Sequence, residues 1–198
     1  MAVEMKSPVL HGLVLAGGRS SRMKKDKGLI SYHNKPQREH LFELLSQCCE
    51  YVFTSCRKEQ KIPSSLNPIY DAFNLESPLN GILSTFEKHL NVAWLAVAVD
   101  MPYVNENVLQ FLIAHRNPAK VATCFYDSDG KLPEPLLTIW EPSAFIPLKT
   151  FWKEGGISPR EFLIGHECEK LQYHDPQFHI NINTPEELGG MSELPQKN

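Results

Sequence analysis

The chain of 198 residues lacks the features that would place it in several large classes of proteins. No apolar run approaches the length of a membrane-spanning helix, and residues 1–8 contain no apolar segment of signal-peptide length. The net charge is only −3, which argues against a general nucleic-acid binder. The sequence therefore predicts a protein of the cytoplasm with no membrane or nucleic-acid partner.

Cysteine is present but in a pattern that excludes its common structural roles. The five cysteines include no Cys-x-x-Cys pair, and their number is odd. Neither a zinc site nor a disulfide framework is indicated, so we expect free thiols in a reducing compartment. An arrangement typical of Ser-His-Asp or Cys-His catalysis is also missing. The five positions are Cys48, Cys49, Cys56, Cys124 and Cys168.

What remains is the composition of an ordinary globular domain, 42% hydrophobic and 22% charged. No repeat, low-complexity block or linker divides the chain. We expect one domain over residues 1–190 and a frayed tail over residues 191–198.

Strand and helix patterns alternate along this domain. Such alternation predicts an α/β fold, a Rossmann-like three-layer α/β/α arrangement with a mainly parallel sheet. The apolar run 93–99 is typical of a strand that is covered on both faces. The predicted strands are 9–14, 51–55, 68–71, 93–99, 121–125 and 136–140, with a short extended piece at 28–32. One predicted helix begins at Pro36, and others cover 78–89, 105–115, 143–153 and 158–164. A last helix is expected after Thr184, a natural N-cap that is followed by Pro185.

The most informative stretch follows the first predicted strand. Gly17 and Gly18 end that strand, and five basic residues stand between Arg19 and Lys27. The glycines allow the backbone to approach a ligand closely, and backbone N–H groups and cations can then face one anion. A turn followed by a solvated basic loop is the alternative, and the density of cations favours phosphate binding. The spacing matches neither a Walker A loop nor a Gly-x-Gly-x-x-Gly dinucleotide loop.

Two carboxylates are expected beside this loop. Asp71 and Asp100 each end a predicted strand, and ligands of such sheets bind at the carboxyl ends of the strands. Asp100 alone could cap the next helix. Next to a phosphate-binding loop, a Mg²⁺ ligand is the better interpretation, because Mg²⁺ is held by one or two carboxylates plus substrate phosphates.

Four motifs in order resemble the molybdenum cofactor guanylyltransferases and their sugar-nucleotide relatives. The first motif is Leu-Ala-Gly-Gly-x-Ser-x-Arg-Met-Gly-x-Asp-Lys at residues 15–27, with Lys24 where glycine is usual. A turn of the type Gly-Pro-Leu-x-Gly follows at residues 77–81, with Ser77 in place of the first glycine. Asp-x-Pro stands at residues 100–102, and Asn-x-Asn-Thr-Pro-Glu-Glu-Leu stands at residues 181–188.

The resemblance implies a fold, a reaction and a set of site residues. The fold is that of the nucleotide-diphospho-sugar transferases. The reaction is Mg²⁺-dependent transfer of GMP from GTP to the phosphate of molybdopterin, with a molybdoenzyme chaperone as a further partner. Gly17 in the first motif is typical of the guanylyl rather than the cytidylyl branch. Catalytic roles fall to Arg22, Lys27 and Asp100, with Asp100 on the metal. Nucleotide contacts fall to Leu15, Ala16, Gly17, Gly18, Lys27, Ser55, Asp71 and Asp100.

Two alternatives stay open on the sequence. One is a nucleotidyltransferase for another phosphorylated acceptor, either a sugar phosphate or the pterin of a cytidylyl-type enzyme. The other is a non-catalytic nucleotide-binding relative, which the departures at Lys24 and Ser77 keep possible.

Overall fold

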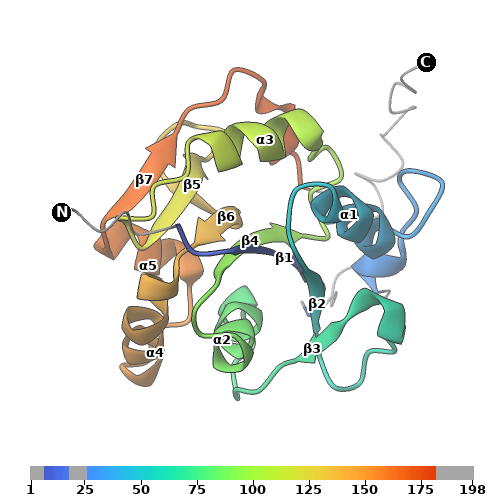
Figure 1. The fold of residues 1–198 in the computed structure, drawn as a ribbon, viewed down its shortest axis with the longest axis horizontal. Coiled ribbons are helices and arrows are strands. Elements are labelled where there is room, and N and C mark those ends of the chain that lie inside the picture. The colour runs from blue at the N-terminus through green and yellow to red at the C-terminus, as the bar shows by residue number, and fades with distance from the viewer. Residues whose placement is uncertain (1–6, 18–25, 182–198) are drawn as a thin grey trace.

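The computed structural model describes residues 7–17 and 26–181, and these residues form one seven-stranded sheet with helices on both faces (Figure 1). The order across the sheet is β3-β2-β1-β4-β6-β5-β7. The strands are β1 (Leu10–Leu15), β2 (Val52–Cys56), β3 (Pro68–Tyr70), β4 (Ala93–Ala98), β5 (Ala122–Tyr126), β6 (Pro133–Trp140) and β7 (Cys168–Leu171).

The sheet is mainly parallel, as the alternation of strands and helices predicts. β3, β2, β1 and β4 are parallel to one another, and β5 is parallel to β7. Within the described chain only β6 runs against its neighbours, β4 and β5. The α/β fold and its parallel half are therefore confirmed, and the carboxyl ends of β1, β2, β3 and β4 meet at one edge.

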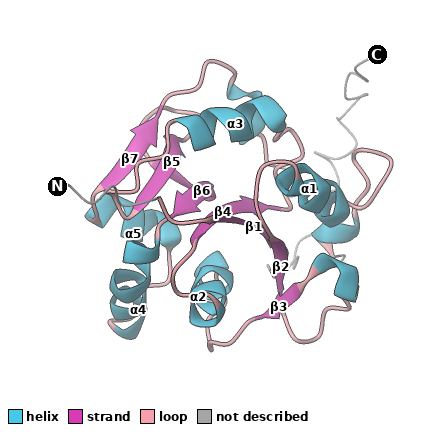
Figure 2. Ribbon diagram, viewed as in Figure 1, coloured by secondary structure: helices cyan, strands magenta, loops and turns pink. Residues whose placement is uncertain are grey.

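The helices form two layers, one on each face of the sheet. α1 (Gln37–Ser46) and α3 (Glu106–Ala114) cover one face, and α2 (Pro78–Lys88), α4 (Phe145–Lys153) and α5 (Pro159–Gly165) cover the other (Figures 1 and 2). All six residues of β4 are buried, as expected for a strand between two helical layers. This is the predicted three-layer arrangement.

Three local expectations were wrong. Residues 27–29 form a 3₁₀ helix instead of an extended piece, because the Asp26 side chain accepts a hydrogen bond from Gly28 N. β6 begins at Pro133, three residues before the predicted strand 136–140. It already pairs there with Tyr126 of β5, whereas its ladder with β4 starts only at Leu137. β7 was not predicted, since its four residues are polar or only half-buried.

The ends of the chain carry two predictions that lie outside the described residues, the helix after Thr184 and the frayed tail 191–198. All five cysteines lie within the described ranges and are free thiols. None of the helices in those ranges has the length and apolarity needed to cross a membrane.

Candidate functional site

A cavity of about 180 Å³ lies at the carboxyl edge of the parallel strands. It opens beside a second hollow of about 580 Å³ over the β3 side of the sheet, and the two share four lining residues. The first cavity is lined by Leu15, Ala16, Gly17, Lys27, Ser55, Asp71, Ser77, Pro78, Gly81, Ala98, Val99, Asp100 and Leu136.

The cavity collects most of the residues that the sequence singles out as nucleotide contacts. These residues come from the ends of four strands and from the 3₁₀ helix at Lys27. Gly18 and Arg22 lie outside the described residues, so their positions stay predictions. The roles of the others stay predictions as well, but their meeting in one cavity is a structural fact. The residues brought together are Leu15, Ala16, Gly17, Lys27, Ser55, Asp71 and Asp100.

Lys27 and Asp100 face each other across the cavity. Lys27 Nζ lies 3.4 Å from Asp100 Oδ2, and the two side chains are only 16% and 19% exposed. Asp100 does not cap the following helix, because Asn105 does so by accepting a hydrogen bond from Val108 N. The capping interpretation of Asp100 is therefore excluded, and its carboxylate is directed to the cavity.

The chemistry of Asp100 fits a divalent cation. Its second oxygen, Oδ1, is buried and has no hydrogen-bond partner within the described chain. Leaving a buried carboxylate oxygen unpaired is costly, and a cation would satisfy it. No group of three His, Cys, Asp or Glu side chains capable of holding a metal occurs among the described residues. A Mg²⁺ ion here would thus rely on one carboxylate and on substrate phosphates, an arrangement typical of this metal.

Asp71 faces Gly17 from the neighbouring strand end. A Cβ atom on Gly17 would lie 3.2 Å from Asp71 Oδ2, a contact tighter than side chains normally make. Burial raises the pKa of Asp71 to about 6, although the positive charge of Arg57 opposes the shift. Asp71 Oδ1 is buried and without a hydrogen-bond partner in the described chain. The carboxylate is therefore an acceptor that a nucleotide could satisfy.

The floor of the cavity depends on a second glycine. Gly81 lies in the first turns of α2, and a Cβ atom there would stand 2.2 Å from Ser55 Oγ at the end of β2. The helix can approach the sheet this closely only without a side chain at residue 81. Ser77 caps the same helix by accepting a hydrogen bond from Leu79 N, and its hydroxyl donates to Ile157 O. The serine that replaces the usual glycine is thus an N-cap.

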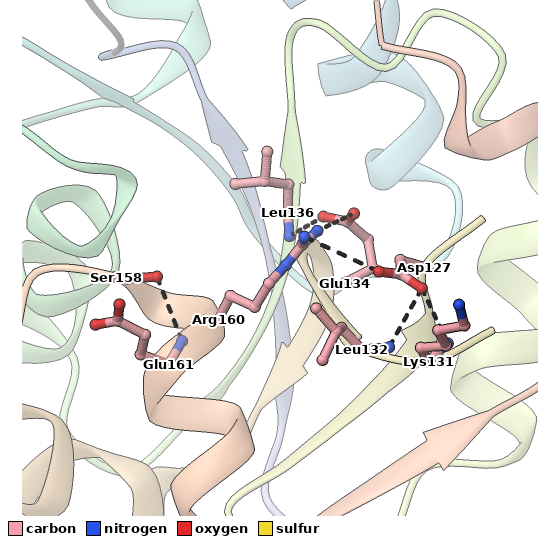
Figure 3. A network of polar contacts seen from close by, with 8 residues as sticks. All are labelled: Asp127, Lys131, Leu132, Glu134, Leu136, Ser158, Arg160 and Glu161. Atoms are coloured by element: carbon pink, nitrogen blue, oxygen red, sulfur yellow. Dashed lines mark hydrogen bonds and ion pairs between the residues drawn. The ribbon is translucent and has the colours of Figure 1, made fainter. Parts of the chain in front are cut away.

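The β6 side of the cavity is supported by a network of charged side chains (Figure 3). Glu134 is 5% exposed; its carboxylate accepts hydrogen bonds from Leu136 N at 2.8 Å and from Arg160 Nη2 at 3.3 Å. Arg160 Nη1 also lies 4.0 Å from Asp127 Oδ2. Burial raises the pKa of Glu134, and the negative charge of Asp100 acts in the same direction. Arg160 therefore offsets negative charge next to the cavity.

Comparison with known proteins identifies the family to which this fold and cavity belong. The family described as "MobA-like NTP transferase domain" matches residues 12–170, which include the carboxyl-edge cavity and both of its carboxylates. The chain belongs to this family. Membership confirms the resemblance that the sequence motifs indicate and makes the chain an enzyme of the nucleotidyltransferase class.

Similar proteins include two whose names refer to the molybdenum cofactor. A molybdenum cofactor guanylyltransferase of Vibrio vulnificus is 30% identical over 200 residues, covering 96% of this chain and 99% of that protein. A molybdenum cofactor biosynthesis bifunctional protein of Synechocystis sp. is 36% identical over 187 residues and covers 91% of this chain. The present chain spans about half, 53%, of that bifunctional protein.

Solved structures support the same fold. Molybdopterin-guanine dinucleotide biosynthesis protein A from Archaeoglobus fulgidus superposes with a TM-score of 0.73 at 22% identity, covering 90% of this chain and 95% of that one. The 2-C-methyl-D-erythritol 4-phosphate cytidylyltransferase from Thermus thermophilus superposes with a TM-score of 0.66 at 9% identity, covering 89% and 94%. These similarities confirm the fold that is expected of a nucleotide-diphospho-sugar transferase.

Sequence reasoning missed several residues that shape the site. Gly81 belongs to a motif that was recognised, yet its need for close helix packing is visible only once Ser55 stands opposite. Leu136 lines the cavity from the antiparallel strand, which the rule about carboxyl ends does not cover. Gln60 donates hydrogen bonds to Ala16 O and to Asp26 Oδ2, next to the cavity residues Gly17 and Lys27. It lies in a polar connection between strands, and no signal in the sequence distinguishes it.

Proposed function

We propose that this MobA-like chain transfers GMP from GTP to the phosphate of molybdopterin and releases pyrophosphate. One observation carries the proposal: the carboxyl-edge cavity joins Gly17 and Asp71 to Lys27 and Asp100 in a chain that aligns along 96% of its length with a guanylyltransferase. Neither alternative, a different acceptor or a non-catalytic relative, is favoured by these relatives.

The protein's own contribution to such a transfer is positioning and charge. Two anions must meet, the acceptor phosphate and the α-phosphate of GTP, and an anionic pyrophosphate must leave. Lys27 would bind the triphosphate from one wall of the cavity, and Arg22 is proposed to add a second cation. Asp100 would hold Mg²⁺ through its carboxylate. When bound, Mg²⁺ supplies positive charge to the phosphate oxygens.

A general base is not required in this scheme. The attacking phosphate monoester is already largely ionised near neutral pH, as are other phosphate monoesters with a second pKa of about 6. This agrees with the lining of the cavity, where the described residues include no histidine or cysteine. Orientation and charge neutralisation are then the whole task of the side chains.

The choice of base is proposed to depend on Gly17 and Asp71. Because Gly17 has no Cβ, the backbone can lie against a purine edge, and Asp71 is held within contact distance of the same point. Guanine presents N–H groups that can donate hydrogen bonds to a carboxylate or to a backbone carbonyl. A methyl group at residue 17 would displace this edge or the Asp71 carboxylate.

Release of pyrophosphate tests the proposal directly. Purified protein, Mg²⁺, GTP and molybdopterin should yield pyrophosphate and a guanylylated pterin in equal amounts. Omission of either the pterin or the metal should abolish both products. Pyrophosphate release with a sugar phosphate in place of the pterin would assign a different acceptor. We further propose that the reaction takes place in the cytoplasm and that a molybdoenzyme chaperone receives the product.

A further inference from the structure

The side-chain amide of Gln60 links the segment that carries Gly17 to the segment that carries Lys27. Gln60 follows β2 and lines neither the cavity nor the neighbouring hollow. Its Nε2 donates to Ala16 O at 2.9 Å and to Asp26 Oδ2 at 3.0 Å. Ala16 and Asp26 are the residues next to Gly17 and Lys27, both of which line the cavity. One side chain therefore fixes the separation of two parts of the site.

The orientation of this amide is determined by its surroundings. Gln60 Oε1 accepts a hydrogen bond from Arg57 N at 2.9 Å, and Gln60 N donates to Arg57 O at 3.1 Å. Both N–H groups of the amide thus point to acceptors and its oxygen points to a donor. A flipped amide would set its oxygen against a carbonyl and a carboxylate. The turn after β2 holds the amide in the only orientation that makes all three bonds.

Asp26 passes this constraint on to Lys27. Its other oxygen, Oδ1, accepts from Gly28 N at 2.9 Å and caps the 3₁₀ helix that begins at Lys27. The guanidinium of Arg38, which is 5% exposed, lies 3.7 Å from Oδ2. Asp26 is therefore held from three sides, and the place of the Lys27 side chain opposite Asp100 depends on it.

We propose that Gln60 is a positioning residue for nucleotide binding. It holds the Asp26 cap at a fixed distance from the backbone of Ala16, so that Lys27 faces a nucleotide bound at Gly17. Gln60 itself touches no substrate and acts through Lys27. The proposal rests on the proposed function only in requiring that a nucleoside triphosphate binds the cavity.

A double-mutant cycle tests whether Gln60 acts through Lys27. The variants are Gln60→Glu, which removes both donors and adds a negative charge beside Asp26, and Gln60→Met, which keeps length without charge or donors. Each is made alone and together with Lys27→Ala, and the Kd for MgGTP is measured by calorimetry. We expect Gln60→Glu to raise the Kd at least tenfold in the parent protein and less than threefold in the Lys27→Ala background. Gln60→Met should show the same pattern, with a smaller rise of the Kd in the parent protein than Gln60→Glu causes.

A matched control separates this role from general stability. Gln110 on α3 also donates its amide to a carboxylate, Glu106 Oε1 at 2.7 Å, is exposed, and lines neither the cavity nor the neighbouring hollow. Gln110→Glu should leave the Kd for MgGTP unchanged. Thermal unfolding of every variant checks folding; if Gln60→Glu does not fold, the Gln60→Met cycle decides.

The outcomes are distinct. Equal losses of affinity in the parent and in the Lys27→Ala background would overturn the proposal, as would an unchanged Kd in both Gln60 variants. If the parent protein binds CTP and not GTP, the proposed guanylyl transfer is wrong. The cycle is then run with MgCTP, and non-additive losses still support the role of Gln60.

Discussion

Lys27 and Asp100, which are 73 residues apart in the chain, form an ion pair of 3.4 Å across the candidate active site. Both charges are largely buried, so each stabilises the other before any substrate is present. A bound metal would replace Lys27 as the partner of the Asp100 carboxylate, and the triphosphate would replace Asp100 as the partner of the Lys27 ammonium. The pair therefore keeps two costly charges in place for the nucleotide.

Removal of the Asp100 carboxylate should abolish transfer without unfolding the protein. Asp100→Ala deletes the proposed metal ligand, whereas the buried residues of β4 that precede it are unaffected. We expect pyrophosphate release from MgGTP and molybdopterin to fall at least 100-fold in a variant that still folds, with a lower thermal midpoint because Lys27 loses this ion-pair partner. Asp129→Ala, in an exposed turn, is the control and should keep full activity. Near-normal rates of Asp100→Ala in Mg²⁺ would refute the ligand role.

Loss of the Lys27 ammonium should weaken binding and slow transfer together. A cation on the triphosphate acts in the bound state and in the transition state, so Lys27→Ala should lower kcat/KM about 10- to 100-fold, with part of the loss in the Kd for GTP. Lys149→Ala removes another lysine paired with a carboxylate, that of Glu87, away from the cavity, and should have no such effect. Unchanged affinity and rate in Lys27→Ala would make this lysine a purely structural partner of Asp100.

A methyl group at Gly81 should displace α2 from the sheet. The new Cβ would stand 2.2 Å from Ser55 Oγ, so Gly81→Ala should cost about 1–3 kcal/mol of unfolding free energy and reduce nucleotide affinity. Adding Ser55→Gly removes the clashing atoms and should restore part of the stability, as measured by urea unfolding. Gly165→Ala, where a Cβ would meet nothing within 4 Å, is the control. A Gly81→Ala variant as stable as the parent would contradict the close packing.

The raised pKa of Asp71 predicts a pH-dependent contribution to stability. Burial holds this pKa at about 6, above its ordinary value of 3.8, so the folded state binds the proton more tightly than the unfolded chain. The contribution is full below pH about 4 and is lost as the pH rises through 6. Since one pKa unit corresponds to about 1.4 kcal/mol, the loss is at most about 3 kcal/mol.

Urea unfolding of the parent and of Asp71→Asn at pH 4 and at pH 7.5 measures this contribution. The variant should gain stability relative to the parent as the pH rises, while Asp129→Asn should follow the parent at both values. A constant difference between Asp71→Asn and the parent would show that Asp71 has an ordinary pKa.

The sequence predicts the parts of this protein that depend on local pattern. The apolar run 93–99 and the glycines after the first strand identify a central strand and a ligand loop, because burial on both faces and close backbone approach each restrict residue type. The rule about carboxyl ends of parallel strands correctly brings Asp71 and Asp100 to one cavity.

What could not be predicted depends on contacts between distant segments. The amide of Gln60 reaches residues 34 and 44 positions away, and nothing in its own neighbourhood indicates those partners. The 3₁₀ helix at Lys27 replaces an expected extended piece because the Asp26 side chain caps it. The contact between Glu134 on β6 and Arg160 on α5 joins residues that are 26 positions apart.

Competition between nucleotides tests the central claim most directly. With molybdopterin as acceptor and Mg²⁺ present, kcat/KM is measured for GTP and for CTP, and the product is identified by its mass. A preference for GTP of about ten- to hundredfold is expected, since one unpaired polar group at the base edge costs roughly 1–3 kcal/mol. Gly17→Ala, whose new Cβ would stand 3.2 Å from Asp71 Oδ2, should shift the ratio toward CTP. Equal values for the two nucleotides, or a preference for CTP, would contradict the assignment of guanylyl transfer.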